Sequence, residues 1–183
     1  MKDPFTFIKE NLSLIEEDKW EEFYKNASSS KGTENYCPVG EITNILLECG
    51  IDPLRNMKYI PEHFLSNIVE IKGNLNLKDK NILTIWEDAF YNCQGLKELS
   101  IPEGVEELGN SAISMCFNLK EVRFPSTIKR VGNFNFYRCP VEKIYFNGTM
   151  KEWDSLKLPR QMFFFKAKTS LIHCLDGKTN LRH

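Results

Sequence analysis

Cysteine and histidine are the residue types in this sequence that could do nucleophilic chemistry. The chain has six cysteines and three histidines, and His173 and Cys174 are neighbours. A nucleophilic thiol needs a base within hydrogen-bond reach, whereas adjacent residues of a strand point to opposite faces. His183 stands last in the sequence, where a side chain is usually mobile. We therefore expect no catalytic residues and a protein that is not an enzyme.

The spacing of the cysteines indicates a structural role rather than metal or redox chemistry. Cys93, Cys116 and Cys139 follow one another at intervals of 23 residues. No pair has the C-x-x-C spacing of a zinc or redox site, so we expect no metal and no cofactor. Regularly spaced cysteines in a repeat usually fill small buried positions. We expect reduced thiols, which suit the cytoplasm because disulfides are rare there.

The cysteines mark an internal repeat. Residues 85–107 and 108–130 align without a gap over 23 positions. The two copies share the pairs Ala89/Ala112, Cys93/Cys116, Leu96/Leu119, Lys97/Lys120, Glu98/Glu121 and Pro102/Pro125. A third copy begins at Val131, with one residue deleted after Cys139. Repetition at a fixed period of this length is typical of solenoids, in which each copy is one structural unit.

Each copy contains a pattern that predicts a strand. Leu99 and Ile101 alternate with Glu98 and Ser100, which is the period of two that strands show. Stacked copies would pair these strands in parallel, about 4.8 Å apart. The stretch from Asp88 to Tyr91 suits a short helical turn on the opposite side. The fold class predicted is α/β, a solenoid of parallel strands.

Both ends of such a stack need a cap, because an end copy has no neighbour to cover its apolar face. Residues 1–60 show helical spacing of apolar residues, with one face over residues 42–49 that should stop at Gly50. We predict an N-terminal helical cap over residues 1–60 and the solenoid over residues 61–183. Leu171–Cys174 is predicted as a C-terminal capping strand before a turn.

The repeats resemble a known family. Residues 89–105 read A-F-Y-N-C-Q-G-L-K-E-L-S-I-P-E-G-V, which resembles the bacterial surface-antigen type of leucine-rich repeat, called BspA-like. The likeness covers roughly residues 60–175. Two positions depart from the family pattern, since Ile113 replaces a usual Phe and Asn135 a usual Ala. The resemblance implies a leucine-rich-repeat solenoid that binds a partner and has no enzyme activity.

The flanking segments resemble a narrower group. The stretch C-G-I-D-P-L-R-N-M-K-Y-I-P-E-H-F-L is similar to the leader of short proteins of this type in Firmicutes and their phages. I-Y-F-N-G-T-M-K-E-W-D-S-L resembles the end of their repeat array, and L-I-H-C-L-D-G their last strand. The resemblance implies a phage or mobile-element origin. The apolar run Met162–Phe165 departs from the pattern, because polar residues are expected there.

Charge is divided unevenly along the chain. Residues 1–116 hold 11 Lys and Arg against 20 Asp and Glu, a net charge of −9, whereas residues 117–183 hold 13 against 5, a net charge of +8. The basic half contains Arg123, Lys129, Arg130, Arg138, Lys143, Lys151, Lys157 and Arg160. Such cations can bind phosphate, so nucleic-acid binding is one alternative. No nucleic-acid motif accompanies them, and a solvated basic face is the other alternative.

Outward strand positions should line up across the stack in two columns. One column is Asn76, Ser100, Arg123, Tyr145 and His173, and the other is Asn74, Glu98, Glu121 and Lys143. A solenoid presents such columns as a continuous surface, and Tyr and Arg are enriched at interface hot spots. We predict a partner-binding site made of Ser100, Glu121, Arg123, Lys143, Tyr145 and His173. The alternative is that these residues are simply solvated.

These observations favour a non-enzymatic protein-binding scaffold in the cytoplasm of a host bacterium. The concrete hypothesis is a phage or mobile-element effector that inhibits a host-defence protein, for example an anti-CRISPR inhibitor of a Cas9-type nuclease. A surface adhesin is disfavoured, because the sequence shows no apolar secretory signal and free thiols are expected. No apolar run approaches the ~20 residues that span a bilayer, so no membrane contact is expected.

Overall fold

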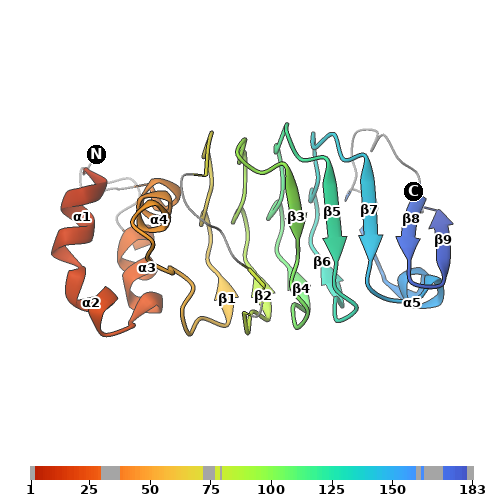
Figure 1. Cartoon of the computed structure of the whole chain (residues 1–183), viewed down its shortest axis with the longest axis horizontal. Coiled ribbons are helices and arrows are strands. Elements are labelled where there is room, and N and C mark those ends of the chain that lie inside the picture. Colours follow the sequence, from red (N-terminus) through yellow and green to blue (C-terminus); the bar gives the residue numbers. More distant parts are fainter. Residues whose placement is uncertain are drawn as a thin grey trace.

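The chain forms an elongated stack of coils with helices at its N-terminal end (Figure 1). The computed structural model describes residues 3–29, 38–71, 77–78, 80–159, 162 and 171–180. The helices are α1 (Pro4–Glu10), α2 (Leu12–Glu16), α3 (Trp20–Ser29), α4 (Val39–Glu48) and α5 (Met150–Ser155). The predicted helical face over residues 42–49 is confirmed, and the helix is followed by Gly50 in the left-handed conformation that favours glycine.

Two sheets run along the stack. One has the order β1-β2-β4-β6, all parallel, and the other has the order β3-β5-β7-β8-β9. The first comprises β1 (Tyr59–Ile60), β2 (Thr84–Ile85), β4 (Glu107–Leu108) and β6 (Arg130–Val131). The second comprises β3 (Glu98–Ser100), β5 (Glu121–Phe124), β7 (Lys143–Phe146), β8 (Leu171–Cys174) and β9 (Gly177–Asn180). The predicted solenoid of parallel strands is confirmed.

The turn between the sheets is where the sequence prediction was wrong. The stretch from Asp88 to Tyr91 is a turn and not helical, because Asp88 and Asn92 adopt left-handed φ values of 55° and 54°. Alternate amides bond to the next coil: Asp88 N–H donates to the Asn110 carbonyl over 3.2 Å and Phe90 N–H to the Ala112 carbonyl over 2.8 Å. The turn is therefore part of the ladder that joins successive coils.

The repeated cysteines lie inside the stack. Cys93 and Cys116 are fully buried and Cys139 is nearly so. The Cys116 thiol donates to the Phe90 carbonyl over 3.1 Å, and the Cys116 amide donates to Cys139 Sγ over 3.3 Å. Burial raises the pKa of the Cys93 thiol to about 12. The five described cysteines are free, and Cys37 lies outside the described residues.

Asn135, the departure from the family's usual Ala, is fully buried and fully bonded. Its side-chain amide donates to the Gly109 and Gly132 carbonyls over 2.8 and 2.9 Å. Its side-chain carbonyl accepts from the Ile113 amide over 3.1 Å. A buried amide without such partners would cost free energy. The substitution is tolerated because Asn135 takes the place of backbone groups in the ladder.

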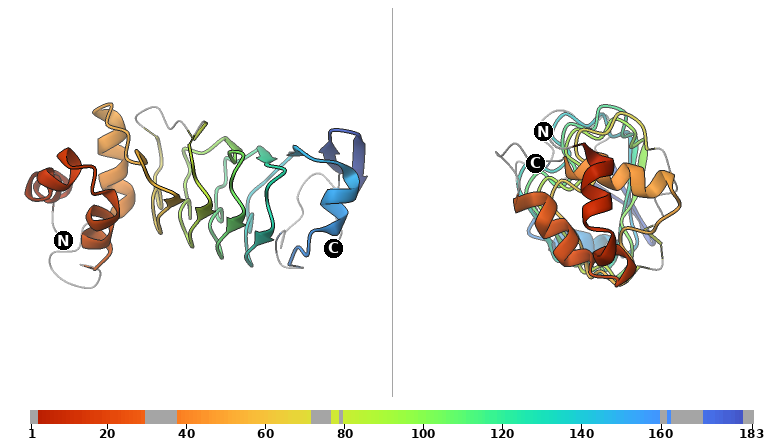
Figure 2. Two further views of the ribbon diagram at one scale, coloured as in Figure 1. Left: turned by 90° about the horizontal axis from the view of Figure 1, so that it is seen from below. Right: turned by 90° about the vertical axis from the view of Figure 1, so that its left-hand side faces the viewer.

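The N-terminal helices pack on the first coil and cover its end (Figure 2). Tyr24 of α3 lies 6.1 Å from Phe64, centroid to centroid, and its hydroxyl is 3.1 Å from that of Thr43 in α4. A Cβ at Gly40 would clash with the backbone of Ser66, so α4 needs glycine there. β1 lies within residues 1–60 and already pairs with β2. The division into a cap over 1–60 and a solenoid over 61–183 stays a prediction.

The C-terminal end is closed by α5 and a hairpin. A capping box of Thr149 and Glu152 begins α5. Trp153 then packs on Phe124 and Phe146, with ring centroids 5.4 and 5.3 Å away. The predicted final strand, β8, is confirmed, but the chain returns as β9, antiparallel to β8, which was not predicted. Of the Met162–Phe165 run, Met162 is described and buried, and the rest lies outside the described residues.

We predict that denatured protein prepared without reductant titrates close to six free thiols. In the native protein, Cys93, Cys116 and Cys139 should react far more slowly than exposed Cys49, because burial hides all three. Burial also raises the pKa of the Cys93 thiol, and the hydrogen bond with Cys139, followed by burial, raises the pKa of the Cys116 thiol. The measurement is the time course of a chromogenic disulfide reagent with and without denaturant. Three disulfides in the denatured sample would contradict both the burial and the reduced state.

We also predict that deleting the N-terminal helices makes the repeats aggregate or melt without cooperativity. A fragment that begins after residue 50 keeps β1, and a fragment that begins after residue 60 lacks it. Neither should fold cooperatively, because Phe64 loses the contact with Tyr24 of α3 that covers it. Within the full chain, Gly40→Ala should cost roughly 1–3 kcal/mol of unfolding free energy, whereas exposed Cys49→Ala should cost little. Circular dichroism melts would measure both. A soluble, cooperatively melting fragment would make the helices a separate domain.

Candidate functional site

The predicted site residues lie on one face of the five-stranded sheet. The structure pairs Ser100 with Arg123, Arg123 with Tyr145, and Tyr145 with His173 in adjacent strands. A second row pairs Glu98 with Glu121 and Glu121 with Lys143. The strand register predicted from the repeat is therefore confirmed over these positions. Asn74 and Asn76, the first members of the two columns, lie outside the described residues. We call this surface the strand face.

Side chains along the strand face contact one another. The Arg123 guanidinium lies 4.0 Å from the centre of the Tyr145 ring, and its Nη2 is 2.6 Å from Glu121 Oε1. The Tyr145 and His173 rings follow, with centroids 5.1 Å apart and planes inclined by 41°. Arg123 is thus held between a carboxylate and an aromatic ring, the two kinds of group that a planar guanidinium bonds and stacks on.

The strand face is open to solvent along its length. Ser100 and Lys143 are exposed, the Arg123 side chain is 46% exposed, and Tyr145 and His173 are half-buried. The register extends the row to Lys178 of β9, which stands opposite His173 and is exposed. The sequence prediction missed Lys178. The Asp176-Gly177 pair at the end of β8 could have revealed it, since such pairs favour hairpins.

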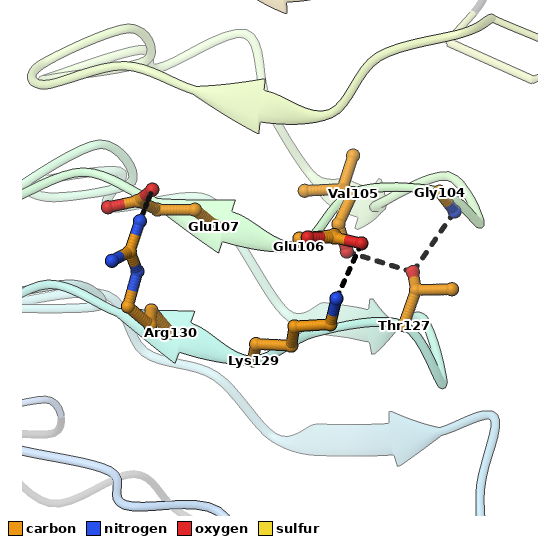
Figure 3. A network of polar contacts seen from close by, with 7 residues as sticks. All are labelled: Gly104, Val105, Glu106, Glu107, Thr127, Lys129 and Arg130. Atoms are coloured by element: carbon orange, nitrogen blue, oxygen red, sulfur yellow. Dashed lines mark hydrogen bonds and ion pairs between the residues drawn. The ribbon is translucent and has the colours of Figure 1, made fainter.

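The other sheet carries ion pairs rather than an open row. Lys129 Nζ lies 2.7 Å from Glu106 Oε1 on the coil before it, and Arg130 pairs with Glu107 in the same way (Figure 3). Beside them, the Thr127 hydroxyl donates to the Val105 carbonyl over 2.9 Å. Lys129 and Arg130 were predicted members of a basic phosphate-binding face. Because acidic groups of the neighbouring coil neutralise them, less of the basic half is available to phosphate than its net charge implies.

The neighbouring His173 and Cys174 do not form a nucleophilic pair. The His173 ring contacts Tyr145, and burial with the nearby charges of Asp176 and Asp154 raises the pKa of the Cys174 thiol. A nucleophilic cysteine needs the opposite shift, toward the thiolate. Within the described part of the chain, no group of three or more His, Cys, Asp or Glu is placed to hold a metal ion.

A comparison with known protein families identifies the type of repeat that forms the coils. The model of the BspA type leucine-rich repeat region, which describes six copies, matches residues 48–158. The chain belongs to this family of BspA type leucine-rich repeat proteins. No curated protein and no solved structure matches the chain significantly. The match begins at the end of α4 and runs past α5.

Membership in the BspA type family has a functional meaning. Leucine-rich repeats are typically protein-interaction scaffolds and are generally not catalytic themselves. The exposed faces of the coils are therefore the place to look for function. No helix in the described ranges is long and apolar enough to cross a membrane.

We predict that the strand face contributes little to folding. Arg123→Ala or Tyr145→Ala should each cost about 1 kcal/mol or less of unfolding free energy, because each removes a half-exposed contact. Phe124→Ala changes the buried neighbour of Arg123 and should cost roughly 3–5 kcal/mol. Urea unfolding would measure all three. Equal losses for Arg123→Ala and Phe124→Ala would make the row structural.

Proposed function

We propose that this protein is a non-enzymatic scaffold that binds a protein partner through its strand face, with Arg123 and Tyr145 as the anchors. The observation that carries the proposal is the ordered contact of Glu121, Arg123, Tyr145 and His173 on an open sheet surface. Tyrosine and arginine are the residue types that most often dominate binding energy at protein interfaces.

The contacts within the row support binding in energetic terms. A flexible arginine loses rotamer freedom when a partner immobilises it, which weakens association. Here Glu121 and Tyr145 already restrict the Arg123 side chain in the free protein. The planar guanidinium still has further N–H donors for a carboxylate of the partner. Lys143 and, farther along the face, Lys178 add two cations and Glu98 adds a carboxylate, so the complementary partner surface has mixed charge, with a carboxylate opposite Arg123.

As the finer hypothesis, the partner is a host-defence protein that the scaffold inhibits, for example a Cas9-type nuclease, with the scaffold encoded by a phage or mobile element and acting in the bacterial cytoplasm. The support is the resemblance of residues 49–65 to the leader of short proteins in Firmicutes and their phages, together with the divided charge. Acidic and basic halves could both steer toward a nucleic-acid-handling machine.

Direct nucleic-acid binding is the second candidate. It draws on the net charge of +8 over residues 117–183 and on Tyr145 and His173, whose rings could stack on bases. Against it stand the ion pairs of Lys120, Lys129 and Arg130 with glutamates of adjacent coils. We therefore favour a protein partner.

The test is affinity capture from a nuclease-treated bacterial lysate, with captured proteins identified by mass spectrometry. The Arg123→Ala, Tyr145→Ala double variant should lose the partner that the wild type recovers. At a true hot spot each substitution should cost on the order of 2 kcal/mol of binding free energy. The matched control is Glu107→Ala with Arg130→Ala, which removes an ion pair from the other sheet and should keep the partner.

The outcomes separate the two candidates. Full retention of the partner by the Arg123, Tyr145 double variant would contradict the strand-face proposal. Recovery only without nuclease, with affinity for single-stranded DNA that falls steeply as salt rises, would favour nucleic acid. Inhibition of a purified Cas9-type nuclease by the wild type, and not by the double variant, would support the finer hypothesis. Absence of inhibition would contradict that finer hypothesis but not the proposal that the protein is a binding scaffold.

A further inference from the structure

A groove lies between α3 and the first coils, away from the strand face. Its volume is about 800 Å³, and its walls come from α3, from β1 with the two residues after it, and from the residue after β2. The side chains that define it are Glu21, Glu22, Lys25, Tyr59, Glu62 and Trp86. The strand-face residues belong to the other sheet, so the groove is a separate surface.

One wall of the groove is an aromatic platform. The Tyr59 and Trp86 rings are stacked almost parallel, with centroids 4.2 Å apart and planes inclined by 5°. Trp86 is nevertheless 41% exposed, whereas Trp20 and Trp153 are almost fully buried. An indole left open to water forgoes much of the free energy that its burial would contribute. Each ring covers one face of the other, so the platform offers a ligand the outer face of the stack and the exposed ring edges.

The rest of the groove is negatively charged. Glu21, Glu22 and Glu62 line it together with one lysine, Lys25, and the charge of Glu22 also acts on Lys19 outside the groove. Glu21 lines the groove together with the platform, and burial, followed by the charge of Glu21, raises the pKa of the Tyr59 hydroxyl. Within the described part of the chain, none of these three glutamates forms an ion pair. Elsewhere in the stack, glutamates such as Glu106 are neutralised by the next coil.

We infer that this groove binds an arginine-bearing segment of a partner protein, with a guanidinium against the stacked Tyr59 and Trp86 rings and its N–H groups on the glutamates. A guanidinium is planar, stacks on aromatic faces and bonds carboxylates through two donors at once. A phosphate-bearing ligand is repelled by the same carboxylates. The inference does not depend on the strand face, because the two surfaces share no residue.

The experiment uses the full chain and a fluorescently labelled peptide in which arginine alternates with serine. Anisotropy should show saturable binding that weakens as salt rises. Trp86→Ala, and Glu21→Gln with Glu62→Gln, should each weaken binding about tenfold. Glu16→Gln is the matched control on α2, where an exposed glutamate outside the groove changes in the same way, and its affinity should match the wild type. A citrulline peptide, which keeps the shape and loses the charge, should not bind.

Three results would overturn the inference. They are equal affinity of wild type and Trp86→Ala, equal affinity for the arginine and citrulline peptides, and self-association of the wild type that Trp86→Ala abolishes. The last would mean that a second copy of the chain fills the groove. Thermal melts of each variant establish that loss of binding is not loss of fold. Arg123→Ala should bind the peptide with wild-type affinity. A failure of the groove inference can therefore be distinguished from a failure of the strand-face proposal.

Discussion

The backbone ladder between successive coils is the constraint on which the rest of the structure depends. An N–H of one coil donates to a carbonyl of a neighbouring coil in both sheets and also in the turns, as with Phe90 and Ala112. A buried backbone N–H or carbonyl without a hydrogen-bond partner costs free energy of folding. Each coil must therefore repeat the backbone geometry of the coil before it. This is why the period of 23 residues holds from Cys93 to Cys139, and why Asn135 is accepted only with its bonds made.

The same constraint creates the proposed binding surface. Inward positions must stay small or apolar to fit between coils, but outward positions are free to vary, and the register aligns them into rows. Arg123 therefore reaches Tyr145, although 22 residues separate them in the sequence. On the other sheet, the same alignment brings Glu107 to Arg130 and neutralises both. One ladder thus aligns an open row of side chains on one sheet and a row of ion pairs on the other.

The sequence predicted the features that follow from the 23-residue repeat, and it did not predict the features that depend on other parts of the structure. The register of Ser100, Arg123, Tyr145 and His173 followed from the period because parallel pairing preserves it. The second sheet was missed because its strands have two residues each, too few to show a period. The stretch from Asp88 was predicted as a short helical turn, because nothing in the sequence signals left-handed φ values there, and the equivalent Phe134 likewise has φ of 58°. The groove joins α3 to Trp86 through contacts far apart in the sequence, which no local pattern contains.

The central claim is that the strand face, and not the row of ion pairs on the other sheet, contacts the captured partner. Site-specific photo-crosslinking tests this most directly, with a photoreactive amino acid placed at Ser100 on the strand face or at Arg130 in β6, at the opposite end of the other sheet from Tyr59 and its groove. Both positions lie in strands and are exposed. The account predicts a covalent adduct with the captured partner from Ser100 and none from Arg130. An adduct from Arg130 alone would contradict it.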